Sequence, residues 1–105
     1  MALKSGERVV VVGCGPVGMV LTLALYRNGI PVTLLERADG PIEDQRAAAI
    51  QPSSLEMLAE LGVTDEIHER GLISPTFHYR DRVSGELVAE FDFSMLADMT
   101  AFPYV

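Results

Sequence analysis

Hydrophobic positions in the first third of the chain predict a strand, a helix and a second strand. Residues 9–12 are four consecutive valines, and such a β-branched run is typical of a parallel strand covered on both faces. From Pro16 to Arg27 the apolar positions follow the period of a helix, with a stripe made of Val17, Val20, Leu21, Ala24 and Leu25. Other apolar residues widen this stripe, so we expect the helix to be buried on more than one side. Residues 32–35 predict the second strand.

Two short helices are predicted next. An apolar stripe begins after Pro52 and ends at Gly62, and Ser53 stands at capping-box spacing from Glu56. Thr64 is expected to cap a second helix over residues 65–70, which carries acidic residues in its first turn.

The period changes to two from Thr76 onward, which predicts an antiparallel hairpin. Phe77 and Tyr79 alternate with polar residues before Ser84-Gly85, and a second alternating segment runs to Phe93. We expect one face of this hairpin to be buried. Residues 94–105 show no clear period and predict no element.

The turn after the first strand carries the pattern Gly13-x-Gly15-x-x-Gly18. Gly13 permits a tight turn, Gly15 lets the backbone approach a pyrophosphate, and Gly18 removes a side chain where the helix crosses the sheet. Pro16 suits the first helical position, and from Val17 on the helix start offers free amides and the positive end of its dipole to an anion. We therefore predict a phosphate-binding turn, with a merely structural glycine turn as the alternative.

An acid at the end of the second strand completes this pattern. Glu36 stands at the spacing where a carboxylate accepts hydrogen bonds from the ribose hydroxyls of adenosine. It would repel a ribose 2′-phosphate, although the neighbouring Arg37 weakens that exclusion. The order of strand, turn, helix, strand and acid predicts an α/β fold that binds an adenine dinucleotide through Gly13, Gly15, Pro16, Val17, Gly18, Glu36 and Arg37.

Composition narrows the range of partners. A chain of 105 residues is at most one domain, and its net charge of −7 argues against nucleic acid or an anionic membrane as a partner. A phosphate would depend on helix amides and on cations such as Arg37 and Arg46. No apolar run is long enough to span a membrane, and the N-terminus lacks a signal-peptide pattern, so we expect a cytoplasmic location. The single cysteine, Cys14, can form no internal disulfide.

No residue set predicts a catalytic or metal centre. His68 and His78 are the only histidines and have no ligand set at metal spacing around them. Phe77 and Tyr79 could line a ring-binding pocket in a larger protein, but core packing is the favoured interpretation.

A count of strands raises a problem for the first strand. A doubly wound sheet flanks its first strand with later strands, yet after Glu36 the sequence offers only helices and a hairpin. An unpaired valine edge is a template for association. We therefore expect the isolated chain to form a homo-oligomer or a swapped dimer.

The segments VVGCGPVGMVLTLALYRNGIPVTLLER and RAAAIQPSSLEMLAELGVTDEI resemble the N-terminal part of single-component FAD-dependent aromatic hydroxylases. This group includes para-hydroxybenzoate, phenol and pentachlorophenol hydroxylases. The resemblance runs over nearly the whole chain, and its second segment is what favours FAD over NAD. It implies that an arginine at the place of Arg46 contacts the flavin cofactor.

The resemblance implies a partial Rossmann-like FAD-binding fold, followed by two short helices and an antiparallel hairpin. Residues 1–75 would be the N-terminal part of the FAD-binding domain, and residues 76–105 the start of the antiparallel sheet of the substrate domain. The implied activity is hydroxylation of a small aromatic substrate with FAD, NAD(P)H and O₂. The later FAD motifs and most of the substrate pocket are not in this sequence, so we expect the chain alone to lack turnover.

Two rival functions stay open at this point. One is an NAD(P)-binding module or another flavoprotein oxidoreductase, since these share the first glycine motif. The other is a non-catalytic fragment that acts through assembly.

Overall fold

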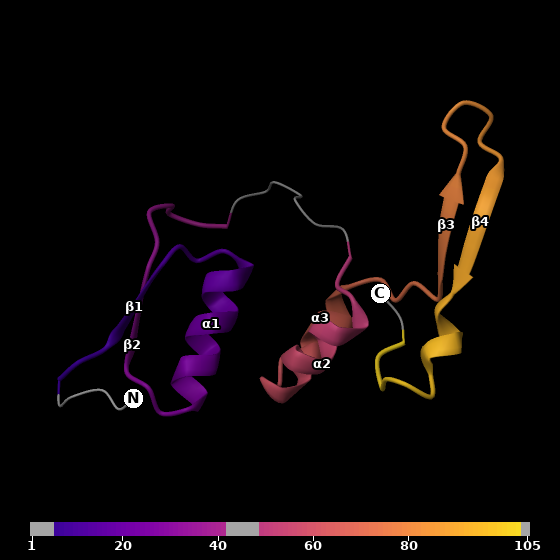
Figure 1. The fold of residues 1–105 in the computed structure, drawn as a ribbon. Helices are drawn as coiled ribbons and strands as arrows, with labels where there is room; N and C mark the ends of the chain where they lie inside the picture. Colours follow the sequence, from indigo (N-terminus) through magenta and orange to yellow (C-terminus); the bar gives the residue numbers. More distant parts are fainter. Residues whose placement is uncertain (1–5, 42–48, 104–105) are drawn as a thin grey trace. The chain divides into compact units, whose positions relative to one another are not determined.

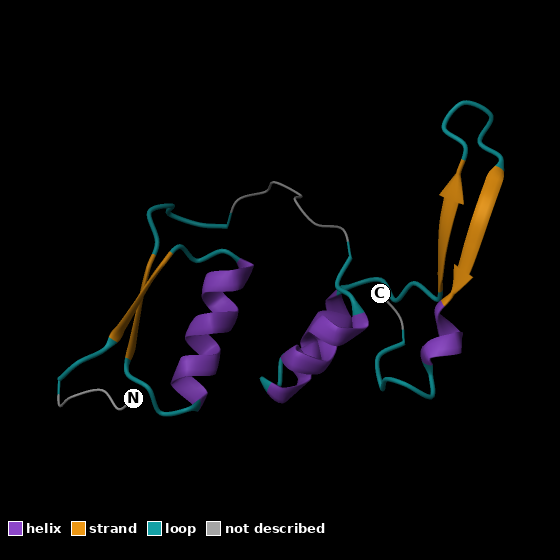
Figure 2. Cartoon of the chain, viewed as in Figure 1, coloured by secondary structure: helices purple, strands orange, loops and turns teal. Residues whose placement is uncertain are grey.

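The computed structural model describes residues 6–41 and 49–103, which divide into two compact units with a boundary between Gln45 and Arg46. Figures 1 and 2 show the elements of both units. In chain order they are β1 (Val9–Val12), α1 (Pro16–Arg27), β2 (Val32–Leu35), α2 (Pro52–Glu60), α3 (Thr64–Arg70), β3 (Thr76–Arg80), β4 (Leu87–Asp92) and the 3₁₀ turn η1 (Phe93–Leu96). This order confirms the predicted fold class. None of the described helices is long and apolar enough to cross a bilayer.

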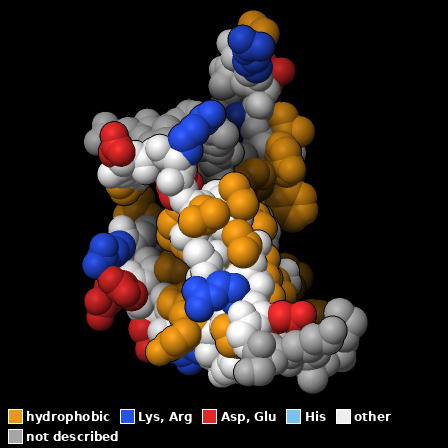
Figure 3. Space-filling model, turned by 90° about the vertical axis from the view of Figure 1, so that its left-hand side faces the viewer, with side chains coloured by type: hydrophobic (Ala, Val, Ile, Leu, Met, Phe, Trp, Pro, Cys, Tyr) orange, Lys and Arg blue, Asp and Glu red, His pale blue; other side chains and the backbone are white. Residues whose placement is uncertain are grey.

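The first unit is a parallel strand pair with one helix. β1 and β2 pair in register from Val9 opposite Val32 to Val12 opposite Leu35. Val11 is buried beneath α1, whereas Val10, Val12 and Leu35 are exposed on the other face of the pair, where hydrophobic side chains gather (Figure 3). The expectation of a strand covered on both faces is therefore wrong for the described chain, because α1 covers one face only.

The burial of α1 also differs from the prediction. No residue of this helix is buried, and Val17, at the start of the expected stripe, is 83% exposed. The half-buried positions are Gly18 and residues 22–25, so within the expected stripe Ala24 and Leu25 are half-buried whereas Val17, Val20 and Leu21 are exposed. The two strands of this unit can cover only one side of α1. The apolar residues on the other sides of α1 therefore stay exposed.

The two helices of the second unit are joined by a buried hydroxyl. Thr64 is 2% exposed, and its Oγ1 donates to the carbonyl oxygen of Leu55 at 3.0 Å. It is the first residue of α3 and not its cap, so the predicted capping role is wrong. The predicted capping box at Ser53 is also wrong, because α2 already begins at Pro52 and has no side-chain cap.

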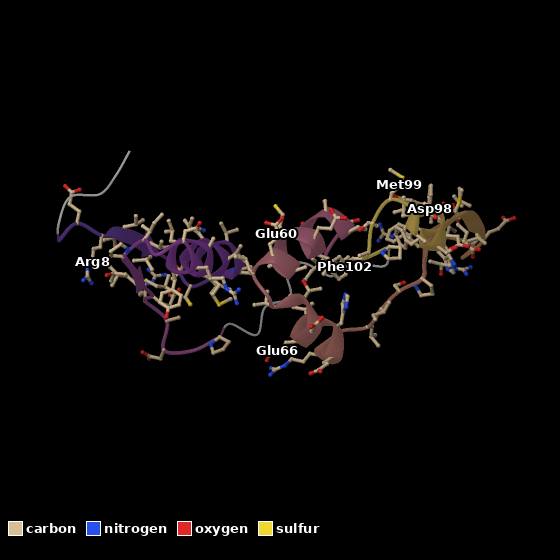
Figure 4. The ribbon with its side chains drawn as sticks, turned by 90° about the horizontal axis from the view of Figure 1, so that it is seen from below. Arg8, Glu60, Glu66, Asp98, Met99 and Phe102 are labelled. Carbon is tan, nitrogen blue, oxygen red and sulfur yellow. The ribbon has the colours of Figure 1, made fainter. Side chains whose placement is uncertain are left out.

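Phe102, close to the C-terminal end of the chain, contacts α3. The rings of His68 and Phe102 lie 5.7 Å apart at 58°, and Phe102 is labelled in Figure 4. A packing role therefore accounts for His68.

The hairpin forms where it was expected. β3 and β4 pair antiparallel, with Phe77 opposite Phe91 and His78 opposite Glu90, and the register shifts at Tyr79/Arg80. The aromatic rings of the hairpin lie against one another, but they are not buried, since Phe77 is 43% exposed and Tyr79 is 56% exposed. The expected buried face is wrong in this respect, because no described element covers it.

Candidate dinucleotide site

The turn between β1 and α1 has the backbone geometry that its glycines suggested. Gly13 has φ +104°, a value that L side chains rarely adopt, and its N–H donates to the carbonyl oxygen of Leu35 at 2.7 Å. A Cβ placed on Gly18 would lie 1.9 Å from the carbonyl oxygen of Gly13 and 3.6 Å from the Val11 side chain. Gly18 is therefore required for α1 to approach both the turn and the strand.

The next part of the turn is open to solvent. A Cβ built on Gly15 would meet nothing within 4 Å. The φ of Gly15, −71°, is one that any residue adopts, so the backbone here does not itself require glycine. α1 begins at Pro16 without a side-chain cap, so the amides of Val17 and Gly18 at the helix start have no side-chain acceptor. This is the arrangement in which a helix start accepts a phosphate group.

The carboxylate of Glu36 lies at the mouth of this turn. Its Oε2 accepts from the N–H of Cys14 at 2.6 Å, while its Oε1 accepts from the N–H groups of Arg37 at 2.6 Å and Ala38 at 2.8 Å. The backbone N–H groups of Ala38, Cys14 and Arg37 lower the pKa of this carboxyl below its ordinary value, with a smaller contribution from the Arg37 charge. Glu36 is therefore ionised at neutral pH.

Arg37 is the arginine of the predicted set that lies among the described residues. Arg37 directly follows Glu36, and both residues are exposed. Arg46 lies outside the described residues. Cys14 is a half-buried free thiol, and its backbone N–H is the group that contacts Glu36.

These features fit the ADP part of a dinucleotide. The turn provides helix-start amides for a pyrophosphate, open space at Gly15, and a carboxylate next to the turn for a ribose. The sequence pattern identified all these residues, but it missed the contact between Glu36 and the N–H of Cys14. Backbone donors carry no residue-type signal, so only the spacing between turn and acid hinted at this contact. Within the described residues, no cluster of His, Cys, Asp or Glu could hold a metal ion.

A family comparison decides between the dinucleotides. Residues 7–102 match the family model described as "FAD binding domain". The chain belongs to this FAD-binding family. The resemblance seen in the sequence is thereby confirmed, and FAD is the cofactor of the family.

Several relatives of this FAD-binding chain are monooxygenases. It is 40% identical over 103 residues to para-nitrophenol 4-monooxygenase of Pseudomonas sp. (strain WBC-3), covering 98% of this chain and 25% of the relative. It is 34% identical to 6-methylpretetramide 4-monooxygenase of Streptomyces rimosus over 94% of this chain and 17% of the relative.

Two solved monooxygenase structures also match this chain. The crystal structure of p-nitrophenol 4-monooxygenase PnpA from Pseudomonas putida DLL-E4 matches with a TM-score of 0.87 and 41% identity, over 93% of this chain and 25% of that one. The flavin-dependent monooxygenase PieE, solved with FAD and substrate, matches with a TM-score of 0.64 and 27% identity, over 81% of this chain and 15% of that one. The FAD-binding chain thus spans about a quarter, or less, of the length of these relatives.

Proposed function

We propose that this chain holds the ADP portion of FAD in a flavin-dependent monooxygenase. The observation that carries the proposal is the open turn at Gly15 with the Glu36 carboxylate at its mouth. In this proposal the amides of Val17 and Gly18 receive the pyrophosphate and Glu36 accepts from the ribose, whereas Gly13 and Pro16 shape the turn. Arg37 and Arg46 are the positively charged residues that we expect to contact the cofactor.

The proposed activity of the whole protein is hydroxylation of a small aromatic substrate with NAD(P)H and O₂. FAD supplies the redox chemistry when it is bound, and the residues of this chain bind and orient it. The relatives named above, which act on para-nitrophenol and 6-methylpretetramide, support this reaction class. We also propose that residues 1–75 belong to the FAD-binding domain and residues 76–105 begin the substrate domain.

Gly15→Ala tests the proposed cofactor site. The added methyl meets no protein atom within 4 Å, so stability should be unchanged, but it occupies the space that a pyrophosphate needs. We expect calorimetric titration to show ADP and FAD affinity falling at least about tenfold, a loss of about 1.4 kcal/mol. Gly40→Ala is the matched control, because Gly40 also has nothing within 4 Å of a built Cβ and no positive φ. Equal affinities for the two variants would contradict the proposal.

Turnover and cofactor choice are tested with the wild-type chain. We expect no NADPH-dependent hydroxylation of para-nitrophenol by the pure chain with added FAD, since the residues of this chain bind one part of the cofactor. Measurable hydroxylation would overturn this expectation. FAD binding weaker than NADH binding would favour the NAD-module alternative.

We propose further that the isolated chain self-associates with a second copy along β1. Among the described residues β1 pairs with β2 alone, and Val10 and Val12 are 54% and 81% exposed on its open face. A valine-rich strand with one free edge favours pairing with another copy. Light scattering over a concentration series should show mass rising with concentration, and a constant monomer mass would refute the proposal. The cytoplasmic location remains a prediction.

A further inference from the structure

The C-terminal end of α1 is closed by two backbone hydrogen bonds around Gly29. The N–H of Gly29 donates to the carbonyl oxygen of Tyr26 at 3.0 Å. The next N–H, that of Ile30, donates to the carbonyl oxygen of Leu25 at 2.9 Å. Gly29 has φ +69°, in the left-handed region that favours glycine. These features make a Schellman motif, in which a glycine directly after a helix allows its last carbonyl groups to be satisfied.

Asn28 precedes this glycine and adds a side-chain bond to the same helix end. Its Nδ2 donates at 2.9 Å to the carbonyl oxygen of Ala24, which also accepts from the backbone N–H of Asn28 at 3.2 Å. Asn28 and Gly29 are both exposed, and Asn28 is the only asparagine of the chain. This end of α1 is the one away from the glycine-rich turn after β1 (Figure 1), so it is separate from the candidate dinucleotide site.

An asparagine followed by glycine can lose its side-chain amide without an enzyme. The backbone nitrogen of the glycine attacks the side-chain carbonyl carbon and forms a C–N bond, which closes a cyclic imide. The bond from that carbon to Nδ2 breaks, and ammonia leaves with the proton of the attacking nitrogen. Water then opens the imide at one of its two carbonyl carbons and gives aspartate or isoaspartate. Glycine favours the attack because it has no side chain to hinder its nitrogen.

We propose that Asn28 is a deamidation site which the folded end of α1 protects, and that its conversion weakens the helix end that protected it. Both reacting groups are engaged in the structure, because the attacking nitrogen of Gly29 donates to Tyr26 and the leaving amide of Asn28 donates to Ala24. The reaction therefore requires the last turn of α1 to open first. The proposal concerns a chemical modification and does not depend on cofactor binding.

The product is expected to destabilise the end of α1. A carboxylate has no N–H to donate, so aspartate would place an acceptor opposite the carbonyl oxygen of Ala24. It would also add a negative charge at the negative end of the helix dipole, which the positive charge of Arg27 in the last turn offsets only in part. Isoaspartate would lengthen the backbone inside the Schellman motif. A converted chain should therefore open more readily at this end.

The wild-type chain tests the site and its protection together. Samples are kept at the same mildly alkaline pH with and without a denaturing concentration of urea, and peptide mapping by mass spectrometry follows aspartate and isoaspartate at Asn28. We expect conversion in urea, and conversion at least about tenfold slower in the folded chain, because several hydrogen bonds must break before the groups react. No conversion in urea, or equal rates in both samples, would overturn the proposal.

Leu25→Ala tests whether the last turn of α1 is what protects Asn28. Leu25 is half-buried in that turn, and alanine keeps the helix while it removes part of the packing there. We expect conversion in the folded variant to be at least about threefold faster than in the wild type.

Val88→Ala is the matched control for Leu25→Ala. Val88 is 71% exposed on β4 in the second unit, so its truncation should leave the conversion rate at Asn28 unchanged. An unchanged rate in Leu25→Ala, or the same acceleration in both variants, would contradict protection by the last turn.

Asn28→Asp reproduces the aspartate product and tests its effect. We expect the equilibrium constant for unfolding of the first unit to rise at least about threefold, measured by urea denaturation through amide signals of residues 6–41. Asn28→Ala loses the same donor without gaining a charge, so it should show a smaller rise. An Asn28→Asp chain as stable as the wild type would overturn the claim that conversion weakens the helix end.

Discussion

Two exposed carboxylates, one in each unit, hold backbone N–H groups in different ways. Glu36 in the first unit reaches across 22 positions to Cys14, whereas Asp81 in the second unit accepts only from residues two and three positions ahead. The first therefore joins two segments of a fold, and the second shapes one turn of a hairpin. A local contact survives the loss of its surroundings, while the contact of Glu36 depends on β1, β2 and α1 all being in place.

The two units also use their side chains differently. The candidate site of the first unit consists mainly of backbone groups and the space left by glycines, whereas the hairpin is organised by rings: Phe77, Tyr79 and Phe91. A change at a glycine should thus damage the first unit most, and a change at a ring should damage the hairpin.

The largest expected effect comes from Gly18→Ala. Its Cβ would lie 1.9 Å from a backbone oxygen of Gly13, and neither backbone segment can move without shifting α1 or the turn. We expect a loss of about 3 kcal/mol in the free energy of unfolding of the first unit. Urea denaturation followed through amide signals of residues 6–41 measures it, and signals of residues 76–92 should keep their wild-type midpoint.

Gly40→Ala is the control for this prediction, because its built Cβ has nothing within 4 Å. A midpoint for Gly18→Ala equal to that of Gly40→Ala would mean that α1 does not pack as closely on the turn as described.

The second effect tests the hairpin through Tyr79→Ala. The Tyr79 ring lies edge-on between Phe77 at 5.1 Å and Phe91 at 5.8 Å, and each such ring pair contributes about 0.5–1.5 kcal/mol. We expect hairpin amides to lose about 1–2 kcal/mol of exchange protection. Val88→Ala is the control in the same hairpin, on β4, since Val88 is 71% exposed and should change protection little. Loss of ADP binding in Tyr79→Ala would contradict the separation of the two units.

The sequence predicted the parts of the fold that depend on backbone conformation. Gly13, with φ +104°, and Gly18, with no room for a Cβ, occupy the positions that their spacing indicated, and β3 and β4 flank the expected turn. In these places one residue type answers one geometric demand, so a pattern is sufficient evidence.

The side of α1 that packs against the strands could not be predicted. α1 is apolar on several sides, so its period is compatible with more than one face toward the strands, and Val17 points outward while Thr22 points inward. Thr64 was missed for a similar reason. A threonine after a loop resembles a cap, and only the packing of α2 against α3 shows that its hydroxyl bonds to Leu55.

Thr22 provides the third effect, a gain in stability. Its Oγ1 is buried in the first unit and has no hydrogen-bond partner. Thr22→Val keeps the shape and removes the hydroxyl, so we expect the free energy of unfolding to rise by about 1 kcal/mol. Thr33→Val is the control: the Thr33 hydroxyl accepts from Nη1 of Arg8 at 3.0 Å, and Arg8 is labelled in Figure 4, so its removal should bring no gain. A loss of stability in Thr22→Val would show that the hydroxyl has an acceptor.

The smallest effect is the pH dependence of the two carboxylates with which the comparison began. Backbone hydrogen bonds lower the pKa of Glu36 below its ordinary 4.5, and Ser84 and Val83 lower the pKa of Asp81 below its ordinary 3.8. A lowered folded-state pKa stabilises the fold above the unfolded-state pKa, and this contribution is lost as the pH falls through the folded-state pKa. Stability should therefore begin to fall near pH 4.5 for the first unit and nearer pH 3.8 for the hairpin turn. Both groups are exposed, so solvent keeps the effect small.

Urea midpoints measured from pH 6 to pH 2.5 should fall less steeply in Glu36→Gln for residues 6–41, and less steeply in Asp81→Asn for the hairpin alone. Parallel curves for Glu36→Gln and the wild type would show that the ionised Glu36 carboxylate, with its bonds to Ala38, Cys14 and Arg37, contributes nothing to the stability of the folded state.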